Sequence, residues 1–187
     1  LLCLPAKYIA GKMMIVRAMM LGLELDIMAP SSHLDDLLPH KNYDFVAIVP
    51  LQAENSLEKL HQFKKIIIGG AKVSDDLATK LKEIKSAIYE TYGMTETITH
   101  IAAKKIGEAY FNVLEHVSIS IDERNCLVID VPSISEDKVI TNDIVQILNA
   151  NQFKWIGRYD NVINSGGIKL FPEQIEAKLE QLENADL

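Results

Sequence analysis

The chain has 187 residues, of which 48% are hydrophobic, enough to form a packed core. Its formal net charge of −7 provides no excess of cations to neutralise a phosphate polymer, so we expect no nucleic-acid partner, although a single bound nucleotide remains compatible with it. Cys3 and Cys126 lack metal-site or redox spacing and are expected to be buried thiols of a cytoplasmic protein.

The longest apolar run, residues 13–23, is interrupted by Arg17 and Gly22 and is too short to cross a bilayer. We therefore expect no membrane insertion. The first residues, Leu-Leu-Cys-Leu-Pro, contain neither a basic leader nor an initiator methionine. We expect them to begin inside a domain and not to form a signal peptide.

The first half of the sequence alternates short apolar runs with amphipathic segments, which is the pattern of βαβ units around a parallel sheet. We expect strands near residues 1–4, 23–28, 45–49, 65–68 and 87–89, and helices near 10–21, 56–62 and 75–81. Ser74 precedes Asp75 and Asp76, and a hydroxyl followed by early carboxylates favours a helix start there. The predicted fold class is α/β.

After about residue 109 the pattern changes to short alternating strands, expected near 116–121, 126–131, 144–148 and 153–156, which favours a small antiparallel subdomain. Pro172 then begins a new amphipathic helix. We place a boundary near Asp160, so that residues 1–157 form one domain and residues 158–187 begin a second α+β domain.

Two polar segments follow predicted strands of the parallel sheet, where open α/β sheets bind ligands. The first is Gly69-Gly70-Ala71, whose missing side chains allow a flat ligand to approach the backbone; a plain tight turn is the alternative. The second is the run from Glu90 to Thr97, which combines an aromatic ring, hydroxyls and a carboxylate; a solvated polar loop is its alternative.

The run Tyr92-Gly93-Met94-Thr95-Glu96-Thr97 resembles the Tyr-Gly-x-Thr-Glu core of the adenylate-forming acyl-CoA ligases. Four further segments match motifs of that family in the same order: Gly69 to Ala71, Thr141-Asn142-Asp143, Gly157-Arg158-x-Asp160, and Ser165 to Lys169 followed by Pro172-x-x-Ile175-Glu176. The resemblance implies that residues 1–157 are the later part of the large domain and that the small domain begins at residue 158.

The resemblance also implies a nucleotide site, with Tyr92 stacked on adenine, Asp143 on the ribose hydroxyls and Arg158 on the nucleotide. The full set of nucleotide-binding residues that it implies is Gly69, Gly70, Ala71, Thr91, Tyr92, Gly93, Met94, Thr95, Asp143 and Arg158.

Members of this family join a carboxylic acid to a thiol in two steps. The carboxylate attacks the α-phosphate of ATP to form acyl-AMP and pyrophosphate, and coenzyme A then displaces AMP. The resemblance implies that Thr95 donates to the phosphate and that Glu96 binds Mg²⁺. Asp160 is then the hinge between the domains, and rotation about it places a coenzyme A tunnel along Ser165, Gly166, Gly167 and Lys169.

The acyl group is expected near the start of the chain, where Pro5 to Gly11 resembles a family segment with Tyr8 at its aromatic position. The runs 92–104 and 160–169 resemble the o-succinylbenzoate CoA ligases of menaquinone biosynthesis. A dianionic acid needs a cation for its distal carboxylate, and Arg17 is the candidate, with His100 beside it. Arg17 as a surface arginine, His100 as a structural histidine, and another aromatic or fatty acid as substrate are the alternatives.

Two family elements are missing from the sequence: the phosphate loop with its lysine, expected before residue 1, and the catalytic lysine, expected beyond Leu187. The chain is therefore expected to be part of a longer product or to have lost full catalysis, and a non-catalytic nucleotide-binding fragment is a further alternative. A homodimer is compatible with the resemblance, and no residue specifies it.

Overall fold

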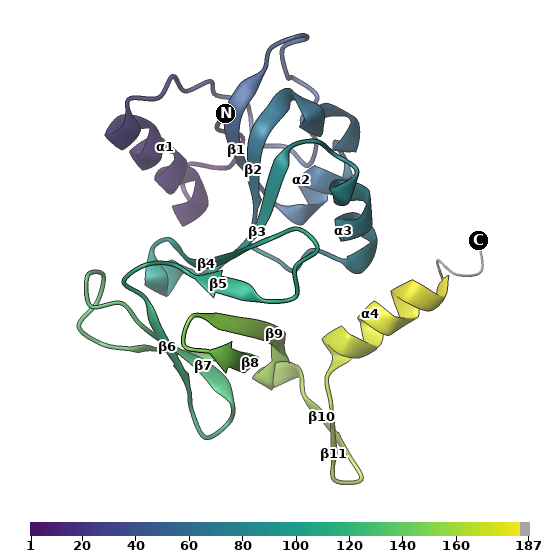
Figure 1. Ribbon diagram of the computed structural model, residues 1–187. Coiled ribbons are helices and arrows are strands. Elements are labelled where there is room, and N and C mark those ends of the chain that lie inside the picture. The colour runs from purple at the N-terminus through teal and green to yellow at the C-terminus, as the bar shows by residue number, and fades with distance from the viewer. Residues whose placement is uncertain (184–187) are drawn as a thin grey trace.

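The computed structural model describes residues 1–183 (Figure 1). The helices are α1 (Ile9–Leu21), α2 (Pro50–Glu54), α3 (Asp75–Lys82) and α4 (Pro172–Glu183), with the short 3-10 helices η1 (Leu57–Gln62), η2 (Thr95–Thr97) and η3 (Tyr159–Asn161). The strands are β1 (Tyr43–Ile48), β2 (Phe63–Ile68), β3 (Ala87–Gly93), β4 (His100–Lys105), β5 (Phe111–Val113), β6 (Ser118–Ile121), β7 (Cys126–Asp130), β8 (Val139–Asn149), β9 (Gln152–Arg158), β10 (Ile163–Ser165) and β11 (Ile168–Leu170). The predicted α/β class is confirmed.

Strands β1 to β9 form one continuous sheet in the order β1-β2-β3-β4-β5-β9-β8-β7-β6. β1, β2 and β3 are parallel, and every later pairing in this sheet is antiparallel. β3 therefore has a parallel neighbour on one side and an antiparallel neighbour on the other. The predicted antiparallel region exists, and it is joined to the parallel strands by hydrogen bonds through β4 and β5.

The parallel strands are covered on both faces, as βαβ units require. Val46 and Ile48 of β1 pack in the core that contains Leu77 and Leu81 of α3. The residue between them, Ala47, belongs to the smaller cluster that contains Met14 of α1. Because successive side chains of a strand point to opposite faces, α1 and α3 lie on opposite sides of the sheet (Figure 1).

A second core lies between the antiparallel strands. It contains the fully buried side chains Ile101, Leu127 and Phe153, and Tyr92 and Met94 from the end of β3 pack against it. The chain thus has one core under the parallel strands and another under the antiparallel strands, and β3 contributes to both. The two cysteines are buried and free, as predicted.

Several predicted elements need correction. Instead of strands at 1–4 and 23–28, the structure has one isolated parallel bridge between Leu2 and Ile27, held by two backbone hydrogen bonds. The segment 56–62 forms η1, a 3-10 helix, and α2 begins at Pro50 directly after β1. β4 and β5 were not predicted, because β5 has only three residues and β4 shows no clear alternation.

The last part of the chain extends from β9 as the β10–β11 hairpin and then returns as α4 (Figure 1). α4 packs against α3 and β9. No helix among the described residues is long and apolar enough to span a membrane.

Candidate nucleotide site

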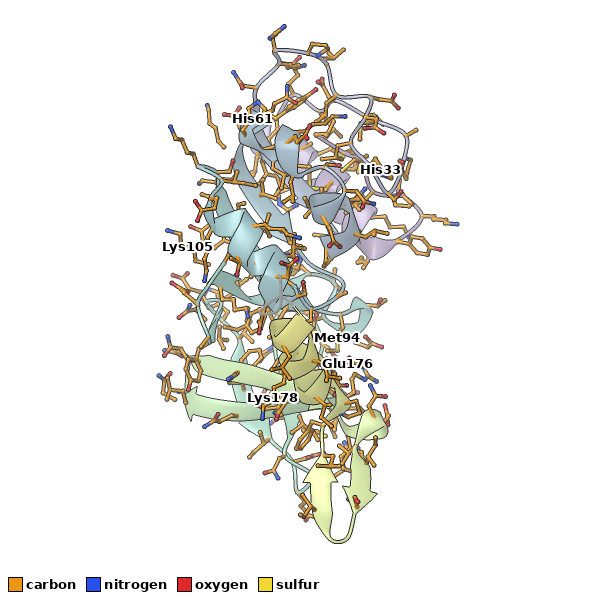
Figure 2. The ribbon with its side chains drawn as sticks, turned by 90° about the vertical axis from the view of Figure 1, so that its right-hand side faces the viewer. His33, His61, Met94, Lys105, Glu176 and Lys178 are labelled. Atoms are coloured by element: carbon orange, nitrogen blue, oxygen red, sulfur yellow. The ribbon has the colours of Figure 1, made fainter. Side chains whose placement is uncertain are left out.

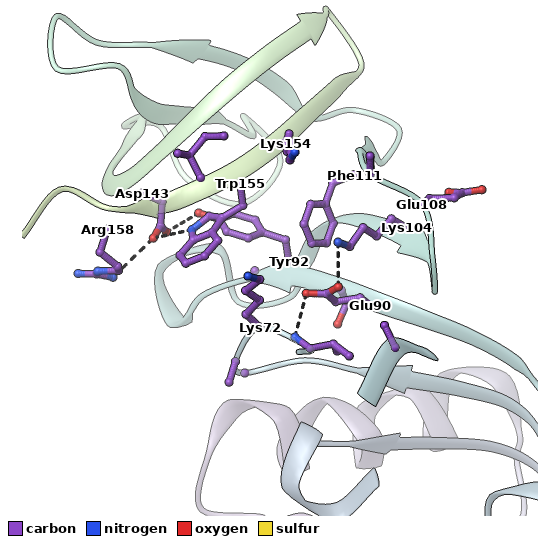
Figure 3. A pocket seen from close by; sticks show the side chains of 18 of the residues that line it. Lys72, Glu90, Tyr92, Lys104, Glu108, Phe111, Asp143, Lys154, Trp155 and Arg158 are labelled. Atoms are coloured by element: carbon purple, nitrogen blue, oxygen red, sulfur yellow. Dashed lines mark hydrogen bonds and ion pairs between the residues drawn. The ribbon is translucent and has the colours of Figure 1, made fainter. Parts of the chain in front are cut away.

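A cavity of ≈ 1070 Å³ opens where β3 passes from the parallel to the antiparallel part of the sheet (Figure 3). Its walls come from α3, β3, β4, β8, β9 and α4. Met94, which follows β3, and Lys178 of α4 both line it (Figure 2). Nine of the predicted site residues line it: Gly70, Ala71, Thr91, Tyr92, Gly93, Met94, Glu96, Asp143 and Arg158. The segments 69–71, 91–96 and 143–158, far apart in sequence, therefore meet at one cavity.

The turn after β2 lies directly against β3. A Cβ atom on Gly69 would come within 2.6 Å of Thr91 Oγ1, and Gly70 has a φ of +85°, so both positions favour glycine. The Thr91 hydroxyl donates to the carbonyl of Ile68 at 3.2 Å. Gly70 therefore exposes its backbone to the cavity without an intervening side chain, whereas Gly69 packs against Thr91.

Tyr92 links β3 to β8 and β9 at the cavity. Its hydroxyl donates to Asp143 Oδ2 at 2.6 Å, and its ring meets Phe153 edge to face at 5.3 Å between centroids. Burial, and then the Asp143 carboxylate, raise the pKa of Tyr92 far above its ordinary value. The Tyr92 phenol therefore stays protonated and keeps donating to Asp143.

Asp143 has two further partners on β9, one through a hydrogen bond and one through an ion pair. Trp155 Nε1 donates to Asp143 Oδ1 at 3.2 Å, and Arg158 Nη1 lies 3.8 Å from the same oxygen. Asp143 and Arg158 are paired across β8 and β9, which explains why residues 15 apart in sequence meet here. Asp143 is only 7% exposed. This buried carboxylate is therefore surrounded by donors from Tyr92, Trp155 and Arg158. Trp155 was not predicted as a site residue.

Arg158 also contacts the predicted hinge residue. Its Nη2 atom lies 3.0 Å from Asp160 Oδ2, and the Asn142 amide donates to the same carboxylate at 3.2 Å. Asp160 itself is exposed and does not line the cavity. The nucleotide motif and the predicted hinge are thus joined through one guanidinium group.

The predicted phosphate and metal residues lie in η2, next to the end of β3. Thr95 and Glu96 are both exposed, and Glu96 lines the cavity whereas Thr95 does not. The Thr97 hydroxyl accepts from the amide of Met94 at 3.1 Å, and Ile98 has a φ of +61°, a conformation that a β-branched residue rarely adopts. The loop is therefore held in a fixed and locally strained shape.

A magnesium ion fits this loop only together with a phosphate ligand. No group of three or more His, Cys, Asp or Glu side chains with metal-site geometry occurs within residues 1–183. Glu96 supplies a single exposed carboxylate. Mg²⁺ commonly binds one or two carboxylates together with substrate phosphates, and Glu96 meets that requirement.

An ion pair that was not predicted lies on the wall of the cavity. Glu90 Oε2 is 2.9 Å from Lys104 Nζ, and their side chains are only 7% and 19% exposed. Glu90 Oε1 also accepts from the amide of Val73 at 3.3 Å, just after the glycine turn (Figure 3). Sequence motifs gave no signal for this pair, because it depends on the register between β3 and β4.

The predicted acyl-site residues lie outside the cavity lining. Arg17 is half-buried on α1, with its guanidinium 5.1 Å from the Phe45 ring centroid and no ion pair to a described carboxylate. Burial, and then the charge of Arg17, lower the pKa of His100. The structure therefore brings Arg17 and His100 into the same neighbourhood. Tyr8 is exposed at the start of α1.

The predicted coenzyme A residues lie on the β10–β11 hairpin, which projects from the sheet (Figure 1). Ser165, Gly166, Gly167 and Lys169 are all exposed, and none lines the cavity. Gly166 and Gly167 form the turn with positive φ values of +57° and +84°. Their predicted role stays a prediction.

Two relatives are similar to the chain in sequence. It is 31% identical over 127 residues to the 3,4-dihydroxybenzoate–[aryl-carrier protein] ligase of Bacillus anthracis, matching 65% of this chain and 30% of that protein. It is 24% identical over 215 residues to the 2-succinylbenzoate–CoA ligase of Staphylococcus epidermidis, matching 98% of this chain and 45% of that protein. The chain spans less than half the length of either relative.

The fold is similar to that of a solved ligase. The o-succinylbenzoate coenzyme A synthetase of Bacillus subtilis, solved in complex with ATP and magnesium ion, matches with a TM-score of 0.78 and 19% identity over 95% of this chain and 45% of that chain. The family model described as AMP-binding enzyme matches residues 1–133. Because that match covers more than half of the sequence, and because it agrees with the motifs around the cavity, the chain belongs to the AMP-binding enzyme family.

Proposed function

We propose that the cavity binds the AMP part of ATP and of an acyl-AMP intermediate, within a protein that joins a carboxylic acid to coenzyme A. The observation that carries this proposal is the meeting of Tyr92, Asp143 and Arg158 at one cavity with the glycine turn. The exposed backbone at Gly70 accommodates the flat base. Asp143 already contacts three donor groups, and its carboxylate keeps a further lone pair that can accept from a ribose hydroxyl.

In this proposal the chain stabilises charge and does not supply a nucleophile. Thr95 donates to the α-phosphate, and Arg158 supplies a positive charge beside Asp143 and the nucleotide. Glu96 would hold a magnesium ion that arrives with ATP, and the ion would supply positive charge for the phosphate oxygens. The acid and the departing pyrophosphate then lie near η2, the loop that Thr97 holds in shape.

Calorimetry with AMP tests the nucleotide site without requiring catalysis. We expect Asp143→Asn to lower the affinity for AMP by tenfold or more, because a charged hydrogen bond contributes about 1.5–3 kcal/mol and 1.4 kcal/mol is tenfold. The matched control is Asp130→Asn, at the end of β7 and outside the cavity lining. It should bind AMP as the unaltered chain does.

A comparison of ligands identifies the contact that Asp143 makes. If its carboxylate holds the ribose, the unaltered chain prefers AMP to 2′-deoxy-AMP, and Asp143→Asn removes most of that preference. An equal loss for both nucleotides would show that Asp143 acts only through Tyr92 and Trp155. Absence of AMP binding by the unaltered chain would contradict the proposed site.

We further propose o-succinylbenzoate as the acid. The support is the similarity to 2-succinylbenzoate–CoA ligase over nearly the whole chain, together with an Arg17 charge that acts on His100 and lowers its pKa. Arg17 has no carboxylate partner among the described side chains, so its charge is available to the distal carboxylate of a dianionic acid.

The similarity to a 3,4-dihydroxybenzoate ligase favours a second candidate, another aromatic acid. ATP–pyrophosphate exchange separates the two, measured with o-succinylbenzoate, 3,4-dihydroxybenzoate and benzoate on this chain and on the longest product of its gene. Exchange that requires o-succinylbenzoate and falls at least tenfold in Arg17→Gln supports the first candidate. Exchange with 3,4-dihydroxybenzoate alone supports the second.

A further inference from the structure

The glycine turn at the cavity is held at both ends by β3. At its start, the Thr91 hydroxyl donates to the carbonyl of Ile68 at 3.2 Å. At its end, the amide of Val73 donates to Glu90 Oε1 at 3.3 Å. The position of residues 69–73 relative to β3 therefore depends on two consecutive side chains, Glu90 and Thr91.

Glu90 is in turn held by β4. It pairs with Lys104 in the antiparallel register, and the Glu90 Oε2 to Lys104 Nζ distance is 2.9 Å. Lys104 Nζ also lies 4.7 Å from the centroid of the Phe111 ring on β5, and that ring contacts Tyr92 at 6.0 Å between centroids. The pair thus connects the turn on one side of the cavity to the Tyr92 ring on the other.

Stability alone gives little reason for an ion pair at this place. Removing two charges from water is costly, and apolar side chains of similar volume often stabilise a protein as well or better. Both charged side chains instead lie on the cavity wall, and Glu90 points to the same face of β3 as Tyr92, two residues away. An ion pair fixes distance and direction in a way that apolar contacts do not.

We propose that Glu90 and Lys104 are positioning residues that set the separation between the glycine turn and Tyr92, and so adapt the cavity to a nucleotide base. This inference rests on the proposed nucleotide site, and it assigns no contact between either residue and the nucleotide. Lys104 acts through Glu90 and Phe111, and Glu90 acts through the backbone of Val73.

The first test is a double-mutant cycle on AMP affinity, measured by calorimetry well below the unfolding temperature. Glu90→Gln and Lys104→Met should each weaken AMP binding by about tenfold, since each leaves the other partner without its ion pair. The double variant should bind at least fivefold more tightly than the product of the two losses predicts. Losses that simply multiply would overturn the proposal, because they indicate separate contacts with the nucleotide.

The matched control is Lys41→Met, which breaks a partly buried ion pair with Asp26 that lies outside the cavity lining. It should lower the unfolding temperature and leave AMP affinity within twofold of the unaltered chain. If Glu90→Gln and Lys104→Met behave in the same way as this control, the pair is structural only and the inference fails.

A second measurement decides the inference even where AMP does not bind. Hydrogen exchange of residues 69–73 reports the Glu90 to Val73 hydrogen bond directly. Glu90→Ala should speed exchange in that turn at least tenfold, and Lys104→Met should speed it to a smaller extent. Unchanged exchange in both variants would refute the positioning role, whereas absence of AMP binding by the unaltered chain would refute the proposed nucleotide site alone.

Discussion

At the scale of single residues, the hydroxyl of Tyr92 should contribute measurably to folding. Tyr92→Phe removes a donor to the buried carboxylate of Asp143. We expect the free energy of unfolding to fall by about 1.5–3 kcal/mol, the usual contribution of a hydrogen bond to a charged group. Denaturant unfolding measures it, with Tyr89→Phe as the control in the same strand, because the Tyr89 hydroxyl has no hydrogen-bond partner among the described residues.

His100 provides a prediction that depends on pH. Its pKa is lowered by burial and secondarily by the charge of Arg17. Arg17→Met should therefore raise the pKa of His100, without restoring the ordinary value, because burial remains. Proton NMR titration of the imidazole measures this, and His100→Gln assigns the signal. An unchanged pKa would show that the two side chains are not neighbours.

The same shift sets the sign of a stability effect. Unfolded His100 takes up a proton near its ordinary pKa of 6.5, whereas the folded state takes it up only at lower pH. The unfolded state therefore binds more protons in that interval, and the free energy of unfolding falls as the pH decreases below about 6.5. Arg17→Met should reduce the His100 contribution to this slope.

At the scale of elements, the start of α3 was predicted and is confirmed. The Ser74 hydroxyl accepts from the amide of Leu77 at 3.2 Å, and Asp75 and Asp76 occupy the first turn. Ser74→Ala should lower the free energy of unfolding by about 1 kcal/mol, since one amide at the helix end loses its partner. Chemical denaturation measures this loss, and Ser133→Ala in an exposed loop is the control, which should change it little.

Helices and strands could be predicted where neighbouring residues in the sequence form a clear pattern. α1 and α3 were found within one residue of their predicted limits, because periodicity and caps are local signals. β8 was predicted too short, as 144–148, whereas it begins at Val139. Its early part contains the polar Thr141 to Asp143 segment, which breaks the apolar alternation since Asp143 faces the cavity.

The candidate site was likewise predictable from contiguous motifs and not from contacts between distant strands. The cavity residues within contiguous motifs, such as Gly70, Tyr92 and Asp143, were predicted from their resemblance to the family. Trp155 and Lys104 were missed, because each reaches the cavity only through strand pairing. Register between strands depends on distant partners, and single-sequence patterns do not specify it.

At the scale of the whole molecule, the Glu173 carboxylate joins α4 to the end of β9 and to η3, in addition to the packing of α4 against α3 and β9. Glu173 Oε1 accepts from the amide of Arg158 at 3.2 Å and from the Asn161 side chain at 2.7 Å. Glu173→Ala should loosen α4 and speed hydrogen exchange in residues 172–179 severalfold, with little change in the antiparallel core. Glu176→Ala, an exposed position on the same helix, should leave exchange nearly unchanged. Equal exchange in both variants would contradict this role of Glu173.

Arg158 stands between two carboxylates that belong to different predicted tasks, Asp143 at the cavity and Asp160 at the hinge. The Arg158 guanidinium cannot move closer to both carboxylates at once. A ligand that draws it toward Asp143 therefore weakens its ion pair with Asp160. Free energies of binding are reciprocal, so if the domains rotate about Asp160 as predicted, that rotation would change ligand affinity by the same factor. The Arg158 side chain alone would then couple occupation of the cavity to the position of the predicted hinge.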